Sequence, residues 1–539
     1  MNSGNISSHP LRVAIVGGGP RGLVAVEALA GHMSDREMAV TLFEPHEAPG
    51  AGPNYVPDQT PLNLLNIALR ALYLPAPERG EAFETWLDGR YGPNDYPPRA
   101  VIGAYLHARF ADLHERRAVE VIGRAVTGCE RAKGGWLLRT DEGSDHGPFD
   151  EVLLCPGHQP VRDRQIERWR KHAAGADAIL CEAYPTAALL AATEWQGRTV
   201  AIRGFGLAMI DATRALTEGL GGRFETEADG RLIYSASGRE PARLMPFSLN
   251  GIPPAPKPAT AAIDRPYVVE ERERLAFREA VSSLVEVGDG DLEPIFGVVA
   301  DIAGAKLPTH GRDAVLAWLR DGAGDDPDVP DDEQPEEAMT LYLAMARGEA
   351  APSVGYVTGQ VWRHLQNDLR IAYNPAPKTA AVAEALIPFD EGMKRFSYGP
   401  PAEATARLLA LIAAGKLTLR RVDDPDIELV DGGWRMAETG GADIATAMVD
   451  SVLAGPDIAK VSSPLMAGLR ERGFVSQLGK GLGASVRPDG RIIDANSEPV
   501  EGLSLLGRLA NGSVIATDSL HDCFGEAVRR WARRVAGEC

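Results

Sequence analysis

The sequence predicts an α/β fold with two Rossmann-type dinucleotide-binding domains and an additional, mainly helical domain. Two glycine-rich turns, at 17–22 and 204–209, each follow a short apolar strand and open a helix, which is the pattern of a nucleotide-binding βα unit. Residues 264–387 carry apolar side chains mainly at helical spacing and predict the third domain. A chain of 539 residues has enough material for several cores.

The first glycine turn completes a dinucleotide-binding fingerprint. Residues 12–43 predict strand, turn, helix and strand, and Gly17, Gly19 and Gly22 fit the pattern G-x-G-x-x-G. Gly17 permits the tight turn, Gly19 lets the backbone approach a pyrophosphate, and Gly22 lets the helix pack closely on the strand. The free N–H groups at the start of the helix favour phosphate binding.

An acidic residue, Glu44, ends the second strand, 22 residues after Gly22. Its carboxylate can accept hydrogen bonds from a ribose hydroxyl and would repel a 2′-phosphate. The first site therefore predicts FAD or NAD rather than NADP.

The second glycine turn is less complete. Gly204 and Gly206 follow an apolar strand, but Met209 occupies the third glycine position. Downstream, Ser237 and Arg239 can hold a 2′-phosphate, because a guanidinium pairs with phosphate in a bidentate way. We therefore predict NADPH at this second site, against the alternative that Arg239 belongs to a plain surface loop.

These patterns divide the chain into four predicted segments. Residues 1–160 are the first part of the FAD-binding Rossmann domain, and 161–260 are the NAD(P)H-binding, Rossmann-like domain. Residues 261–400 are a mainly helical insert or substrate-covering domain, and 401–539 return to the FAD domain and end in a C-terminal helix. A proline-rich stretch at 246–258 is either a lid or a linker.

Composition excludes several classes of partner and site. The net charge of −19 disfavours nucleic acid and anionic membranes as partners. No apolar run of about 18 residues predicts a membrane-spanning helix. The five cysteines show neither CxxC pairs nor the spacing of metal ligands, so we expect a reduced, cytoplasmic protein without disulfides or metal.

Several segments resemble the FAD-NAD(P)-binding protein family, which lies near the class B flavin monooxygenases, including amine and amino-acid N-hydroxylases. Some members of that family resemble nitrosuccinate-forming aspartate N-oxygenases. The resemblance covers about the first 250 residues and, more loosely, about the last 140, whereas residues 264–387 match no family that we can name. The segments are IVGGGPRGL, GAGPNY, LNLLN, FETWL, YPPRAVIGAYL, DEVLLCPGH, GFGLAMID and LSLLGRLANGSVIATDSL.

The resemblance implies positions for the cofactor. Asn66 and Arg99 would lie near the isoalloxazine, and Arg99 is also a candidate for a substrate carboxylate. Gly157 would close the strand that returns under the cofactor. Asp518 would hydrogen-bond the ribityl chain or pyrophosphate, or simply cap the following helix. FAD itself would be held by Gly17, Gly19, Arg21, Gly22 and Glu44.

The resulting hypothesis is an FAD-dependent, NADPH-using monooxygenase that transfers oxygen from O2 to a small polar substrate, at an amine or amino-acid nitrogen. The cofactor carries this chemistry, so no catalytic side chain is assigned. His107 and His158 are the histidines nearest the motifs, but ordinary packing explains them as well. An FAD reductase without oxygen insertion and a catalytically silent flavin-binding protein are the alternatives, and the incomplete second turn at Met209 keeps both open.

Overall fold

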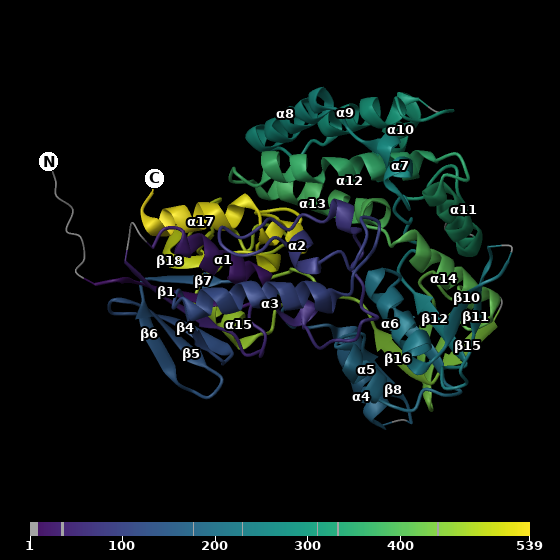
Figure 1. Ribbon diagram of the computed structural model, residues 1–539, viewed down its shortest axis with the longest axis horizontal. Helices are drawn as coiled ribbons and strands as arrows, with labels where there is room; N and C mark the ends of the chain where they lie inside the picture. Colours follow the sequence, from purple (N-terminus) through teal and green to yellow (C-terminus); the bar gives the residue numbers. More distant parts are fainter. Residues whose placement is uncertain are drawn as a thin grey trace.

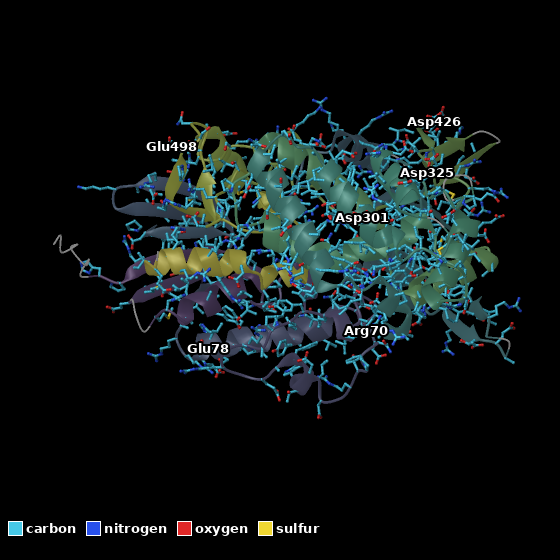
Figure 2. All side chains as sticks on the ribbon, turned by 90° about the horizontal axis from the view of Figure 1, so that it is seen from above. Arg70, Glu78, Asp301, Asp325, Asp426 and Glu498 are labelled. Atoms are coloured by element: carbon cyan, nitrogen blue, oxygen red, sulfur yellow. The ribbon has the colours of Figure 1, made fainter. Side chains whose placement is uncertain are left out.

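Two mainly parallel sheets and a helical block make up the computed structural model (Figure 1). It describes residues 9–33, 37–175, 177–228, 230–309, 311–330, 334–438 and 441–538. In these ranges no helix is both long and apolar enough to cross a membrane. Exposed charged side chains cover the outside, among them Asp301, Asp426 and Glu498 (Figure 2).

The first sheet has six strands in the order β17-β18-β7-β1-β2-β3. Its neighbours pair in parallel, except β17 with β18. The carboxyl ends of the parallel strands therefore lie at one edge. The strands are β1 (Leu11–Val16), β2 (Met38–Phe43), β3 (Glu120–Ile122), β7 (Glu151–Leu154), β17 (Arg491–Ile493) and β18 (Pro499–Leu505).

Helices and a small sheet cover the two faces of this first sheet. Leu23, Leu106 and Trp531 belong to the core on one face, whereas Trp136 and Leu465 belong to the core on the other. The first core uses α1 (Pro20–Ala30), α2 (Phe83–Leu87), α3 (Arg99–Glu115), α16 (Leu520–Cys523) and α17 (Glu526–Ala536). The second uses β4 (Val126–Ala132), β5 (Gly135–Thr140), β6 (Asp145–Phe149) and α15 (Pro464–Glu471).

The second sheet is parallel throughout, in the order β12-β9-β16-β8. Its strands are β8 (Ile179–Glu182), β9 (Thr199–Arg203), β12 (Arg243–Phe247) and β16 (Ala447–Asp450). One core contains residues of α5 (Thr186–Ala191), α6 (Leu207–Thr217) and α14 (Ala402–Ala413). The opposite core contains residues of α4 (Arg164–Gly175) and of the antiparallel strands β13 (Asp426–Val430), β14 (Gly433–Glu438) and β15 (Gly441–Ala445).

The structure corrects the predicted extent of the last segment, 401–539. Helix α14 and strand β16 belong to the second sheet, and the chain returns to the first sheet only after β16. Strand β16 is four residues long and pairs with β9, about 250 positions earlier in the chain. A pairing at such a separation leaves no local signal in the sequence.

The helical block fills the span between the proline-rich segment and α14. Phe277, Trp362 and Phe396 are fully buried in its core. Its helices are α7 (Ala261–Asp264), α8 (Glu271–Val287), α9 (Glu293–Gly304), α10 (Arg312–Arg320), α11 (Pro335–Arg347), α12 (Val354–Tyr373) and α13 (Ala380–Ser397). The mainly helical character predicted for this span is thus what the structure has.

The proline-rich segment is a packed connection. The backbone N–H groups of Ala255, Lys257 and Ala259 donate to carbonyls of the helical block and of Pro400 just after it, at 2.9–3.0 Å. Ala255, Pro256, Lys257 and Pro258 are all buried. Of the two readings, the structure therefore favours a linker over a lid.

Candidate active site

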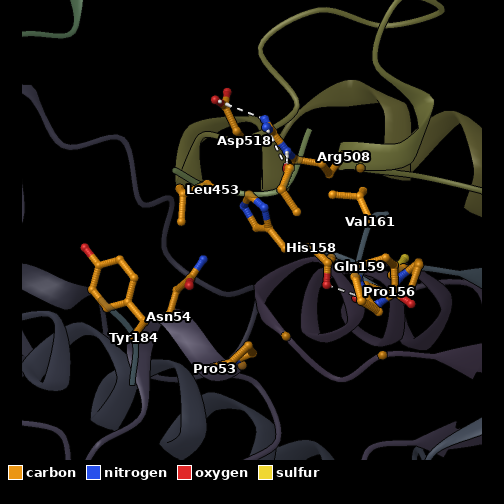
Figure 3. A pocket seen from close by; sticks show the side chains of 18 of the residues that line it. Pro53, Asn54, Pro156, His158, Gln159, Val161, Tyr184, Leu453, Arg508 and Asp518 are labelled. Carbon is orange, nitrogen blue, oxygen red and sulfur yellow. Dashed lines mark hydrogen bonds and ion pairs between the residues drawn. The ribbon is translucent and has the colours of Figure 1, made fainter. Parts of the chain in front are cut away.

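One cavity of about 1030 Å³ lies where the carboxyl ends of the two parallel sheets meet (Figure 3). Residues at or just beyond the ends of β1, β2, β7 and β18 line it on one side, and residues after β8, β9 and β16 line it on the other. Open α/β sheets bind their ligands outside the carboxyl ends of the strands. Both sheets thus present their binding edges to the same space.

The first glycine turn is shaped by close backbone approaches. Gly17 has a φ of +101°, and a Cβ there would lie 2.2 Å from the carbonyl oxygen of Cys155. A Cβ on Gly22 would lie 2.2 Å from the carbonyl oxygen of Gly17. Gly19 instead lines the cavity at the start of α1, where a Cβ would meet only Gly52, at 3.7 Å. The space in front of the helix is therefore open to a phosphate.

Glu44 lies at the carboxyl end of β2, lines the cavity and is buried. Its Oε2 accepts a hydrogen bond from the Gly18 N–H at 2.6 Å, and its Oε1 accepts one from the His46 N–H at 2.9 Å. Each carboxylate oxygen has a further lone pair. The side chain can therefore fix the glycine turn and accept from a ribose at the same time.

Arg21 follows the turn, lines the cavity and is buried. Its Nη2 forms an ion pair with Asp522 Oδ2 at 2.7 Å, and its Nη1 donates to the Asp522 carbonyl at 3.3 Å. These contacts tie α1 to α16. Arg21 therefore holds two walls of the cavity together, a role that the sequence motif did not reveal.

The C-terminal motif contributes Thr517 and Asp518 to the cavity. Burial alone would raise the pKa of Asp518, but the charges of Lys394, at 2.9 Å, and Arg508, at 3.6 Å, hold it below its ordinary value. The cap of α16 is Ser519, whose side chain accepts from the Asp522 N–H. Asp518 is thus not the helix cap, which was one of its two predicted roles.

Thr517 was missed by sequence reasoning. Its Oγ1 is buried and has no hydrogen-bond partner in the described part of the chain. A buried hydroxyl without a partner is costly, so a ligand in the cavity that bonds to it would be stabilised. Gly157, three residues after β7, also lines the cavity, with a φ of +66° and open space around its Cβ position.

Asn66 and Arg99 are placed outside the cavity lining. The Asn66 carbonyl accepts a hydrogen bond from Lys257 Nζ at 2.8 Å. Arg99 Nη2 pairs with Asp211 Oδ2 at 2.5 Å, and its Nη1 donates to the Tyr184 hydroxyl at 3.3 Å. Tyr184 lines the cavity, so Arg99 contacts a lining residue but not the cavity itself.

The second glycine turn follows β9. Gly204 has a φ of +109°, and a Cβ there would lie 2.6 Å from Ser451 Oγ. Gly206 is the N-cap residue of α6 and has open space around its Cβ position. Arg203, just before the turn, and Ser451 both line the cavity. The turn thus adjoins the cavity through its neighbours.

Ser237 and Arg239 lie at the opposite end of α6 from this turn. Ser237 Oγ donates to the Leu220 carbonyl at 2.7 Å, and Arg239 lies beside Gly221. The 11 residues of α6 separate the two places by roughly 16 Å. The structure therefore does not bring Ser237 and Arg239 to the turn. They follow a hairpin of β10 (Arg223–Thr226) and β11 (Leu232–Ser235), and the strand that pairs with β9, β12, comes only after them in the chain.

His158 projects into the cavity between Leu453 and Arg508 (Figure 3). Desolvation and the nearby charge of Arg508 hold its pKa below the ordinary value, so the ring is neutral at pH 7. His107, by contrast, packs with its Nδ1 2.9 Å from the Pro49 carbonyl. Of the two histidines nearest the motifs, His158 alone belongs to the lining of this cavity.

The sequence matches one family model and is similar to two curated enzymes. A family model described as FAD-NAD(P)-binding matches residues 14–159. A nitrosuccinic acid synthase of Aspergillus oryzae is 27% identical over 546 residues, covering 87% of this chain and 82% of that protein. An L-aspartate N-monooxygenase (nitrosuccinate-forming) of Streptomyces davaonensis is 29% identical over 290 residues, covering 45% of this chain and 44% of that one.

Solved structures show the same fold. The reduced form of an ornithine hydroxylase from Pseudomonas aeruginosa superposes with a TM-score of 0.53 at 12% identity, covering 98% of this chain and all of that chain. An ornithine N-hydroxylase of Kutzneria, a structure with reduced FAD, NADP+ and L-ornithine, gives a TM-score of 0.50 at 12% identity, covering 98% and 99%. The predicted α/β fold with two Rossmann-type domains is confirmed.

Proposed function

We propose that this chain is an FAD-dependent, NADPH-using monooxygenase that oxygenates the nitrogen of a small amino acid. The observation that carries the proposal is the shared cavity, because the carboxyl edges of both parallel sheets line it. Two dinucleotides bound at those edges would bring their redox-active ends together. The similarity to aspartate N-monooxygenases supports an amino acid as the substrate.

The first sheet fits FAD. Gly19 and the start of α1 offer free backbone N–H groups, Glu44 offers a ribose acceptor, and the Thr517 hydroxyl lacks a partner within the described residues. When bound, FAD supplies the redox chemistry: it takes a hydride from NADPH and passes the electrons to O2. The second sheet, with Arg203 and Ser451 at the cavity, is the place for NADPH.

The reaction balances with NADPH as the reductant. One atom of O2 forms a bond to the substrate nitrogen, and the other leaves as water with the two electrons from NADPH and two protons. The protein must exclude water from this site and position the amine. The ion pair between Lys394 of α13 and Asp518 joins the helical block to the cavity wall.

We infer a cytoplasmic location, where NADPH is available and thiols stay reduced. Cys129, Cys155, Cys181 and Cys523 are free cysteines in the structure. Amino acids and O2 are both present in that compartment.

NADPH oxidation under air with a panel of amino acids tests the proposal, with hydrogen peroxide and hydroxylamine products measured in parallel. The expected result is one amino acid that accelerates NADPH oxidation and yields N-oxygenated product. Peroxide in a one-to-one ratio to NADPH with every amine would contradict it and favour a reductase. A wild-type protein that binds no FAD would contradict the first step of the proposed reaction, hydride transfer from NADPH to FAD.

A further inference from the structure

Arg370, on α12, is a buried guanidinium that has no counter-charge in the described ranges. It is only 9% exposed. Its Nη2 donates to the Tyr398 hydroxyl at 3.1 Å and approaches Ser519 Oγ at 3.4 Å, whereas its Nε is buried without a partner. Among the described carboxylates, none forms an ion pair with it.

This state is unusual for an arginine, because a buried charge is costly unless a partner of opposite charge compensates it. Other buried arginines of this protein follow that rule. Arg21 pairs with Asp522 and Arg109 pairs with Glu27, at 2.7 and 2.8 Å. An unpaired, buried guanidinium instead marks a place where an anion from outside the chain would be stabilised.

The position of Arg370 connects it to the cavity. Ser519, whose Oγ accepts the hydrogen bond from Arg370 Nη2, lines the cavity beside Asp518. Asp518 itself is occupied by Lys394 and Arg508, so it does not neutralise Arg370. Arg370 itself does not line the cavity; it stands directly behind Ser519, at the seam between the helical block and the C-terminal motif.

The other titratable neighbour is His521, which stacks on Tyr73 with ring centroids 4.3 Å apart. Burial and the charge of Arg370 lower the pKa of His521 to about 4, so this ring is neutral at pH 7. The His521 ring therefore adds no positive charge beside the guanidinium.

We propose that Arg370, with the hydroxyl of Tyr398, binds a carboxylate of the amino-acid substrate. The inference rests on the proposed function and extends it, since it assigns the group that orients the substrate. A guanidinium pairs with a carboxylate in a bidentate way, which fixes direction as well as position. Anchoring the carboxylate at the seam leaves the amine free to face the cavity.

The test uses the flavin-loaded enzyme and two probes, L-aspartate as substrate and succinate as a carboxylate without an amine. Arg370→Met, Arg370→Lys and the control Arg320→Gln are compared. Arg320 belongs to the same block but pairs with Glu293 on the surface. We measure kcat and KM for L-aspartate, succinate affinity by calorimetry, NADPH oxidation without substrate, and the melting temperature.

The expected result for Arg370→Met is a rise of KM and of the succinate Kd by about ten- to a hundredfold. Flavin content stays as in wild type. The unliganded variant melts at the same or a higher temperature, because an unpaired buried charge is removed. Arg370→Lys shows a smaller loss of affinity, and Arg320→Gln shows none.

An unchanged KM for L-aspartate and an unchanged succinate affinity in Arg370→Met would overturn the inference. A lower melting temperature of Arg370→Lys, together with wild-type succinate affinity of that variant, would also overturn it. Succinate separates the two proposals. If wild type binds succinate through Arg370 but oxygenates no amine, the proposed function fails while the carboxylate site stands. If wild type oxygenates an amino acid and the variants do so equally well, the carboxylate site fails alone.

Discussion

Arg99 of α3 and Asp211 of α6 form an ion pair between the two nucleotide domains, with 2.5 Å between Nη2 and Oδ2. The Asp211 side chain is 6% exposed and also accepts a hydrogen bond from the Tyr184 hydroxyl, at 2.5 Å. Tyr184 lines the cavity. One buried carboxylate thus links the domain interface to the wall of the proposed active site.

Replacing Asp211 by Asn should destabilise the protein. The change leaves the Arg99 guanidinium without its carboxylate in a mostly buried place, which costs about 3 kcal/mol of the free energy of unfolding. Urea unfolding monitored by circular dichroism measures it. The exposed pair Arg139–Asp145 supplies the control, since Arg139→Gln should change little. Equal stability of Asp211→Asn and wild type would show that the pair does not support the interface.

Replacing Gly19 by Val should remove FAD without unfolding the chain. The new side chain would project into open space in front of α1, where the pyrophosphate is expected, and would meet only Gly52 within the protein. Flavin absorbance per protein measures the loss, and circular dichroism checks the fold. Gly392→Ala, at a helical position with open space, is the matched control. A Gly19→Val protein as yellow as wild type would refute the placement.

Stability should fall as the pH is lowered from about 6.5 to about 4, partly through His521. Burial and Arg370 lower its folded pKa to about 4, so the unfolded state, with a pKa near 6.5, binds the proton first. After allowance for solvent screening, this one group contributes about 2 kcal/mol across that window. Melting temperature against pH for wild type and His521→Phe measures it. Parallel curves for the two proteins would contradict the assignment.

Arg239→Ala should leave the preference for NADPH over NADH unchanged. The residue lies at the far end of α6 from the second glycine turn, although the sequence suggested that it meets the 2′-phosphate. The ratio of kcat/KM for the two nucleotides measures the preference. A variant that loses the preference would restore the original role of Arg239.

Local sequence patterns correctly predicted the first βαβ unit. Gly22 and Glu44 occupy the positions that the motif requires, because their contacts, with Gly17 and Gly18, lie within about thirty residues along the chain. The second nucleotide unit was harder. Its strand β12 follows an inserted hairpin, and its strand β16 comes from far downstream, so spacing alone misplaced Ser237 and Arg239.

The sequence also does not indicate which partners the side chains contact. Arg99 and Asn66 lie in motifs expected near the flavin, yet Arg99 turns toward Asp211 and the Asn66 backbone accepts from Lys257. Arg370 and Thr517 drew no attention as residues in a sequence. They stand out only in the folded structure, where Arg370 Nε and Thr517 Oγ1 are buried and have no hydrogen-bond partner in the described part of the chain.

In the proposed reaction, one oxygen atom of O2 is transferred to a substrate nitrogen. The most direct measurement is mass spectrometry of the product formed from an amino acid, NADPH and isotopically labelled O2. We expect an N-oxygenated amino acid that carries the label, formed in proportion to the NADPH consumed. Labelled hydrogen peroxide together with an unmodified amino acid, for every amine that the enzyme is offered, would contradict it.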